Sequence, residues 1–335
     1  MYEGDEPGKG VTVYVIDTGI RTTHTEFEGR ARWGTTVDPE GPSEDDHGHG
    51  THVAGTVGGK TYGVAKHAEL VAVKAFDKTG KGTSDDILAG VVWVDKDVSE
   101  RALRAAEVGY SESKGSVINL SLSAGQNDAL DDGVRKAIEH GITVVAAAGN
   151  DDQDACVRSP GDVSETITVG ASTVEDQLWD KSNWGRCVDL FAPGHNVKSA
   201  FKSSDTATFT ASGTSMAAPH VAGVVAYLLS IYPHQTFNPQ STGASLLEAY
   251  TKAYGVLPDF VSRVLPDPEI FGSVHRTASF EGSLTPAQVK DAILRMATEG
   301  ILGDTKGTDN FLLFNNATSA DVHSWAVQHS WPLFY

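Results

Sequence analysis

The chain has 335 residues, of which 40% are hydrophobic and 21% are charged, and its formal net charge at pH 7 is −18. This composition is typical of a globular protein, and no apolar run approaches the length needed to cross a bilayer. Nucleic acid and anionic membrane surfaces both repel a strongly acidic chain, so neither is expected as a partner.

The first segment of interest is an unbroken β-branched and aromatic run at residues 11–16, which predicts a buried strand. This strand ends in Asp17, followed by Thr18 and Gly19. After residues 21–42, which we expect to form a surface loop, His49 stands at the start of a small-residue helix. A carboxylate therefore follows a strand, and an imidazole opens the next helix.

Strands and helices alternate through the middle of the chain. We expect strands at 70–76, 117–122 and 142–148, a helix capped by Ser84 that runs to about Val98, and a helix at 129–140 ended by Gly141. Residues 96–115 are charged and irregular, and they are expected to be either an exposed connection or an extension of the helix. Strands that are apolar throughout are typical of parallel sheets. The pattern predicts an α/β fold with a mostly parallel central sheet and helices on both faces, and a site at the carboxyl edge of the sheet.

A third segment, residues 213–223, places Ser215 where an apolar stretch at 221–229 takes up helical spacing. The positive end of a helix favours an anion formed beside it. We expect Pro219 to fall in the first turn, where no intrahelical hydrogen bond is lost. Taken alone, the run fits a core helix with an incidental serine equally well.

Together the three segments supply the carboxylate, imidazole and hydroxyl of an activated-serine site. Residues 14–19, 62–66, 182–185 and 191–194 complete a pattern that resembles the subtilases, the subtilisin-type serine proteases, and within them the proteinase K branch and the cerevisin-like enzymes of fungal vacuoles. The order Asp, His, Ser is that of subtilisin, whereas an α/β-hydrolase runs Ser, Asp, His. The resemblance implies a subtilisin-like fold and a serine endopeptidase.

The resemblance assigns catalytic roles to four residues. Ser215 is the expected nucleophile, His49 the general base, and Asp17 the group that orients the imidazole. Asn150 follows the strand at 142–148, and its amide is expected to donate to the oxyanion beside the Ser215 backbone N–H. The alternative for Asn150 is an Asx turn. The hydroxyl of Thr214 is a weaker candidate for assistance.

The resemblance also implies that substrate binds as an added strand. The backbone of Ser121, Leu122 and Ser123 is expected to pair with the substrate main chain on one side. Ala147, Ala148 and Gly149 are expected to form a wall of the primary specificity pocket. Arg158 falls near the base of this pocket. We expect it to point to solvent; the alternative is that it biases the pocket toward acidic or polar side chains.

Two structural features are expected by resemblance, although the chemistry itself requires no cofactor. Cys156 and Cys187, the two cysteines, are expected to form a disulfide, the alternative being two free thiols. A calcium ion is implied at the backbone carbonyls of Ser164 and Thr166 and the carboxylate of Asp189. The alternative for Asp189 is a solvated carboxylate at a strand end.

Two rival functions remain open: a catalytically silent subtilase fold that binds proteins, and a metallohydrolase using Asp45, His47 and His49. We expect His52 to be a core residue.

The expected organisation is one peptidase domain over 1–316, with a surface insertion at 232–283 before a helix that begins after Thr285, and a C-terminal tail at 317–335. The resemblance implies polypeptide substrates, a signal peptide and a pro-region ahead of residue 1, with the pro-region acting as a folding partner. It also implies a monomer in an extracellular or vacuolar location.

Overall fold

The structure is a computed structural model that describes residues 6–38, 41–109, 111–232 and 284–313. The expected insertion, apart from Tyr232, and the expected tail lie outside these residues. The domain boundaries drawn there therefore stay predictions.

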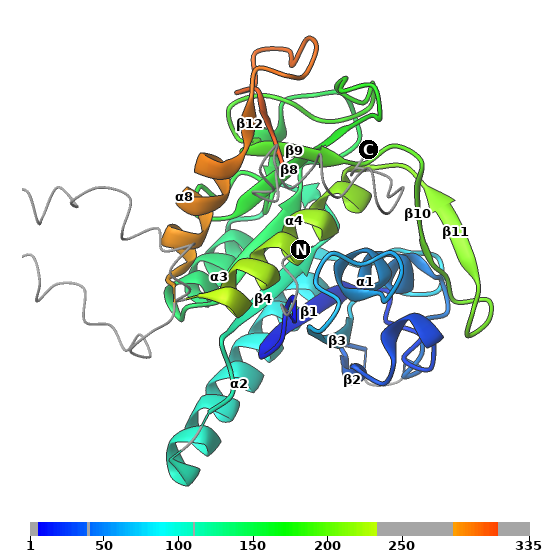
Figure 1. Ribbon diagram of the computed structural model, residues 1–335, viewed down its shortest axis with the longest axis vertical. Helices are drawn as coiled ribbons and strands as arrows, with labels where there is room; N and C mark the ends of the chain where they lie inside the picture. The colour runs from blue at the N-terminus through cyan, green and yellow to red at the C-terminus, as the bar shows by residue number, and fades with distance from the viewer. Residues whose placement is uncertain (1–5, 39–40, 110, 233–283, 314–335) are drawn as a thin grey trace, which may run out of the picture.

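A nine-stranded sheet forms the centre of the molecule, with strand order β12-β13-β9-β8-β6-β4-β1-β3-β2 (Figure 1). The strands are β1 (Val11–Asp17), β2 (Ala31–Thr36), β3 (Glu69–Lys74), β4 (Gly115–Leu120), β6 (Thr143–Ala147), β8 (Ile167–Ser172), β9 (Leu190–Pro193), β12 (Thr298–Glu299) and β13 (Phe311–Leu312). Every neighbouring pair is parallel except β12 with β13. This confirms the predicted α/β fold class.

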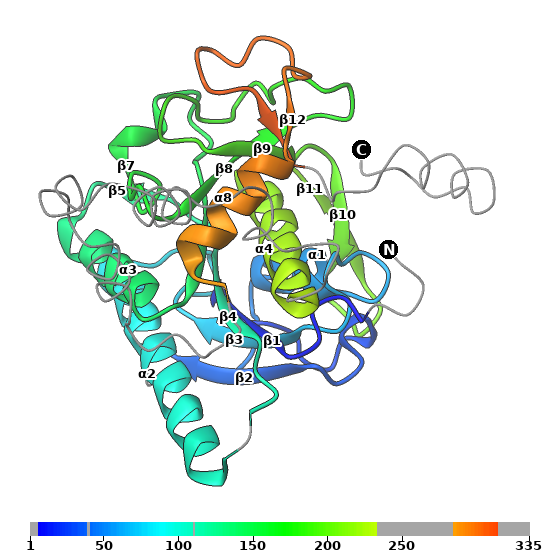
Figure 2. The ribbon, with the colours of Figure 1, turned by 60° about the vertical axis from the view of Figure 1, so that its left-hand side comes forward.

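Helices cover both faces of the sheet, as the sequence predicts (Figure 2). The helices are α1 (His49–Gly58), α2 (Ser84–Val108), α3 (Asp128–Glu139), α4 (Thr214–Ile231) and α8 (Pro286–Met296), with short 3-10 turns η1 (Thr25–Phe27) and η2 (Ala155–Val157). Alternate residues of β1 enter opposite cores: Val13 packs with α1, α4 and α8, whereas Tyr14 packs with α2 and α3. The two-residue period of a strand thus serves two hydrophobic layers.

Two short antiparallel strand pairs complete the strands of the described residues. An antiparallel hairpin joins β10 (Val197–Ala200) to β11 (Thr208–Ala211), and a small ribbon joins β5 (Ala124–Gly125) to β7 (Arg158–Ser159). The hairpin lies beside α1 (Figure 1).

Two sequence predictions of local structure were wrong, and a third had left two alternatives open. Residues 21–42, expected to be a surface loop, contain η1 and the strand β2. β2 lies at the edge of the sheet and pairs only with β3, so its residues are of mixed polarity and do not indicate a strand in the sequence. Thr83, not Ser84, caps α2, because its side chain accepts from Asp86 N while the Asp86 side chain accepts from Thr83 N. The same helix continues to Val108, which confirms the helix extension over the exposed connection as the structure of most of residues 96–115, and it extends from the body of the molecule (Figure 1).

Helix α4 is long and apolar enough to span a membrane, the one such helix found in the described part of the chain. However, 89% of that stretch is buried inside the fold. Its apolar character follows from its place against β4, β6 and β8.

Candidate active site

Asp17 and His49 form the first half of the site. Asp17 ends β1 and is fully buried, and both of its carboxylate oxygens lie 2.8 Å from Nδ1 of His49, the first residue of α1. This approach requires glycine at position 50, since a Cβ there would lie 2.1 Å from the Gly19 carbonyl oxygen and 3.2 Å from Asp17 Cβ. The imidazole keeps 26% of its side-chain surface exposed.

Burial and Asp17 shift the pKa of His49 in opposite directions. Burial alone would lower the pKa of His49, but the charge and hydrogen bond of Asp17, with a smaller contribution from Asp45, outweigh it and raise the pKa above 6.5. Asp17 therefore both orients the ring and stabilises the imidazolium that a general base becomes.

Asp45 holds the loop that leads into α1. Its carboxylate accepts hydrogen bonds from the Thr18 hydroxyl, the Thr51 hydroxyl and the backbone N–H groups of His47, Gly48 and Thr51. This organising role was missed from the sequence, where Asp45 was considered only as a metal ligand.

The arrangement of Asp45, His47 and His49 does not support the metallohydrolase hypothesis. Donor groups occupy both oxygens of Asp45, and no three His, Cys, Asp or Glu residues in the described ranges lie close enough to hold a metal ion. His52 is a core residue, as expected: its Nε2 donates to the carbonyl oxygens of Val197 and Phe209, and burial lowers its pKa to about 4.

Ser215 and Asn150 form the second half of the site. Ser215 is the second residue of α4, and Asn150 lies in the loop after β6. The Asn150 Oδ1 accepts from Thr214 N at 2.8 Å and from Thr214 Oγ1 at 2.9 Å, which leaves its amide nitrogen as the donor end. The Asx-turn alternative is wrong, because the side-chain oxygen bonds to α4 rather than to its own loop.

The two nitrogens expected to donate to the oxyanion lie close to Gly213. A Cβ built on Gly213 would lie 3.5 Å from Asn150 Oδ1 and 3.7 Å from both Asn150 Nδ2 and Ser215 N. Both nitrogens are therefore near one point beside the start of α4, and their role as oxyanion donors stays a prediction.

Pro219 lies in the second turn of α4, not in the first as expected. Having no N–H, it cannot donate to the Ser215 carbonyl oxygen. The Ser121 hydroxyl donates to that oxygen instead, at 2.8 Å. The proline thus frees a carbonyl that ties the start of α4 to the chain leaving β4.

The expected substrate-binding residues lie at the carboxyl edge of the sheet. Residues 121–123 follow β4, and residues 147–149 end or follow β6, the neighbouring strand. The two segments come close, since a Cβ on Gly149 would lie 3.2 Å from Ser123 Oγ.

Buried Asn183 fixes the loop after β6 and was missed as a positioning residue. Its Nδ2 donates to the Ala148 carbonyl oxygen, while its Oδ1 accepts from Asp151 N and Gln153 N. The only sequence signal was its place in the motif at 182–185. Arg158 is 27% exposed, and its Nη2 donates to Oδ2 of half-exposed Asp151 at 2.6 Å, so the expectation that it points to solvent stays a prediction.

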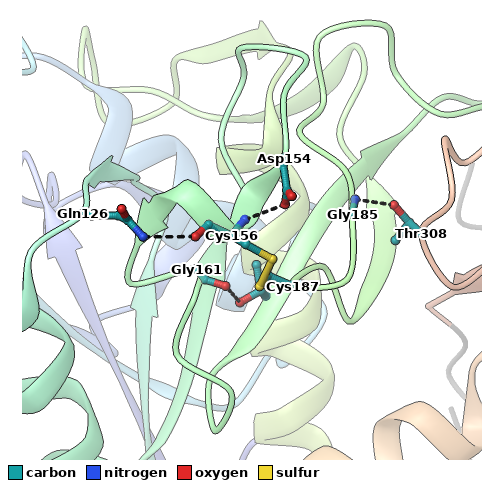
Figure 3. The surroundings of a disulfide bond; sticks show 8 residues. Gln126, Asp154, Cys156, Gly161, Gly185, Cys187 and Thr308 are labelled. Atoms are coloured by element: carbon teal, nitrogen blue, oxygen red, sulfur yellow. Dashed lines mark hydrogen bonds between the residues drawn. A yellow bond between two sulfur atoms is a disulfide. The ribbon is translucent and has the colours of Figure 1, made fainter.

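Cys156 and Cys187 form the expected disulfide, with Cα atoms 5.2 Å apart (Figure 3). Asp154 Oδ1 accepts from Cys156 N beside it. The bond closes a loop between residues 31 apart, and in the chain-entropy treatment such a loop stabilises the fold by about 3–4 kcal/mol.

The three expected calcium ligands do converge, but around a different cation. The Nζ of Lys290 lies 2.8 Å from the Ser164 carbonyl oxygen, 2.7 Å from that of Thr166 and 2.7 Å from Asp189 Oδ1. Burial raises the pKa of Asp189, although Lys290 opposes the shift. The expectation of calcium here is therefore not met by the residues present, because an ammonium already fills the place.

Residues 8–260, more than half of the chain, match the model of the subtilase family (Peptidase_S8). The chain belongs to the subtilase family. This confirms the resemblance drawn from the sequence motifs.

Two fungal relatives of this subtilase come from Saccharomyces cerevisiae. Subtilisin-like protease 3 is 40% identical over 316 residues, 94% of this chain and 57% of the relative, and cerevisin is 42% identical over 312 residues, 93% and 43%. A crystal structure of a cold-adapted subtilisin-like serine proteinase is similar with a TM-score of 0.71 and 38% identity, covering 95% of this chain and 93% of that one. The chain spans about half the length of the curated relatives it matches.

Proposed function

We propose that this subtilase is a serine endopeptidase that cleaves polypeptides through an acyl-enzyme on Ser215. The observation that carries the proposal is the Asp17–His49 pair, with both carboxylate oxygens 2.8 Å from Nδ1 of an imidazole whose pKa is raised. The Ser215 hydroxyl oxygen attacks the scissile carbonyl carbon as its proton passes to His49 Nε2. Asn150 Nδ2 and Ser215 N donate to the oxyanion, which is supported by the place of both nitrogens 3.7 Å from the Cβ position of Gly213.

The second half of the reaction uses the same groups. Collapse of the tetrahedral intermediate breaks the C–N bond, and His49 gives its proton to the departing amine. Water then attacks the acyl-enzyme with His49 again as base, and the Ser215 hydroxyl is restored.

Substrate binding follows from the same edge of the sheet. We propose that the substrate main chain lies against residues 121–123 and that the side chain before the cleaved bond enters beside Ala147, Ala148 and Gly149. Two of these are buried alanines, and Arg158, the cation that the sequence places near the base of the pocket, is paired with Asp151. An uncharged, apolar side chain suits such a pocket.

The setting of the enzyme is part of the proposal. The Cys156–Cys187 disulfide favours an oxidising compartment, so we place the protein outside the cell or in the vacuole. The charge of −18 disfavours nucleic acid and anionic membranes as partners. A monomer assisted in folding by its own pro-region fits the family.

Labelling with a fluorophosphonate probe tests the assignment. We expect the wild-type chain to be labelled on Ser215 and a Ser215→Ala variant to resist labelling. Ser212→Ala is the matched control: Ser212 is exposed, its hydroxyl accepts only from Asn196 N among the described contacts, and labelling should persist. Equal labelling of the Ser215→Ala chain would overturn the proposal, and a folded wild type that is never labelled would favour the silent binding protein.

A further inference from the structure

The oxygens that the subtilase resemblance assigns to a calcium ion surround a side-chain ammonium in this chain. We propose that Lys290 is a built-in replacement for that calcium, holding the site together without any free metal. The carbonyl oxygens of Ser164 and Thr166 and the carboxylate of Asp189 all lie within 2.8 Å of Lys290 Nζ. This inference does not depend on the proposed proteolytic activity.

The match between donors and acceptors is complete. An ammonium has three N–H donors, and three oxygens accept them here. The other carboxylate oxygen of Asp189 accepts from Thr168 N at 2.8 Å, so the backbone holds the anion in place. The Lys290 and Asp189 side chains are only 18% and 19% exposed, so the loss of either partner would leave a largely buried charge without its counter-ion.

The lysine reaches this site from a distant part of the chain. Lys290 lies on α8, 126 and 124 residues from its two carbonyl partners, which precede β8, while Asp189 immediately precedes β9. On the same helix, Val289 and Ile293 enter the core. The ammonium therefore fastens α8 to the edge of two central strands, where a bound metal would join only the strands.

Calcium and Lys290 cannot share this site. A calcium ion binds six to eight oxygens at about 2.3–2.6 Å, so one held by these three oxygens would sit almost at the position of Nζ. The ion would be repelled by the ammonium and blocked by its volume.

A tethered cation changes how stability depends on the solution. A diffusible ligand stabilises the folded state in proportion to the logarithm of its concentration, whereas a side chain is always present. We therefore expect the unfolding temperature of this chain to be the same in calcium and in a chelator. Shortening Lys290 should make stability depend on calcium, because the three oxygens would then be free to bind the ion beside an open surface pocket of about 340 Å³ lined by Ser164, Lys290 and Leu294.

The test measures thermal unfolding midpoints at one scan rate, in excess EDTA or with calcium chloride as the only added metal. All chains carry Ser215→Ala to prevent self-digestion. With Lys290 present, we expect the same calcium response in the chain and in its Asp189→Asn counterpart. Lys290→Ala in EDTA should lower the midpoint by about 4–7 °C, because one partner of a largely buried ion pair is lost, and calcium should recover part of this loss.

Two further variants make the test specific. Arg295→Ala removes an exposed cation of the same helix, paired with Asp291, and should change neither the midpoint in EDTA nor the calcium response. Each chain is compared with its Asp189→Asn counterpart, so that calcium bound elsewhere cancels. Asp189→Asn should abolish the calcium recovery of Lys290→Ala.

Three outcomes would overturn the proposal. The first is a calcium effect on the chain with Lys290 intact that Asp189→Asn removes, since the metal would then occupy the site. The second is a Lys290→Ala chain as stable as the parent in EDTA. The third is a Lys290→Ala chain that calcium does not stabilise, since the oxygens would then be no calcium-type site.

Discussion

Thr214 is the residue whose replacement tests most directly how the proposed oxyanion site is held. It is fully buried at the start of α4, and its hydroxyl donates to Asn150 Oδ1 at 2.9 Å and accepts from Gly149 N at 3.2 Å. Thr214→Val keeps the shape and removes only the hydroxyl. Asn150 then keeps a single hydrogen bond to α4, the one from Thr214 N.

The magnitude follows from the bonds lost. One hydrogen bond that positions Asn150 is worth about 0.5–1.5 kcal/mol, which corresponds to a fall in kcat of about 2- to 12-fold. The stranded Gly149 N–H should separately lower the free energy of unfolding by about 1–3 kcal/mol. Asn150→Ala should cost more, about 10²–10³-fold in kcat, which is the known effect of removing this donor in subtilisin itself.

The assay is hydrolysis of a chromogenic peptide by enzyme whose active sites are counted by fluorophosphonate titration. We expect Thr214→Val to lower kcat with little change in KM, and Thr214→Ser, which keeps the hydroxyl, to stay near the wild type. If Thr214 acts through Asn150, adding Thr214→Val to Asn150→Ala should cost almost nothing further in kcat. Additive losses, or an effect on KM alone, would refute the reasoning.

Two other changes probe the pair and the pocket. Asp17→Asn should lower kcat by about 10⁴-fold. Because burial then acts on His49 without the opposing charge of Asp17, the pKa of His49 should fall, and the acid limb of the kcat/KM profile should move to lower pH. An acid limb that moves to higher pH would contradict this. Arg158→Ala should change the ratio of cleavage after apolar residues to cleavage after glutamate in a peptide library by no more than about twofold from the wild-type ratio, since Arg158 is already paired with Asp151. A selective loss of cleavage after glutamate would show that the charge of Arg158 faces the pocket.

The parts of the fold that were predictable carry strong local signals. An apolar run such as 11–16 needs only its own residues to indicate a strand buried on both faces, and Thr285 with Pro286 marks a helix start wherever it lies. Asp17 and His49 were predictable as a pair because a strand end and a helix start meet at the carboxyl edge of a parallel sheet.

The parts that were not predictable depend on partners far away in the sequence. The edge strand β2 owes its pairing to β3, and its own residues are too mixed to show it. The far half of α2 lacks a continuous apolar face and carries paired charges such as Glu100 with Arg104 instead. Lys290 lies well over a hundred residues from the carbonyl groups that it contacts, so no window of sequence connects them.

The missed positioning residues share one physical cause. Loops at the carboxyl edge leave the ladder of the sheet, so their backbone N–H and C=O groups need other partners once they are buried. The Thr18 hydroxyl accepts from Gly50 N, the Ser121 hydroxyl donates to Ser215 O, and Asn183 bonds to the chain on both sides of Asn150.

Each of these side chains therefore holds a residue of the proposed mechanism through its main chain rather than through its functional group. Such a residue is buried and polar, and a sequence analysis that looks for acids, bases and nucleophiles does not detect it. It follows that the chemistry can be read from a few motifs, whereas the rigidity that makes the chemistry fast is distributed over hydroxyls and amides whose importance appears only once the loops are folded together.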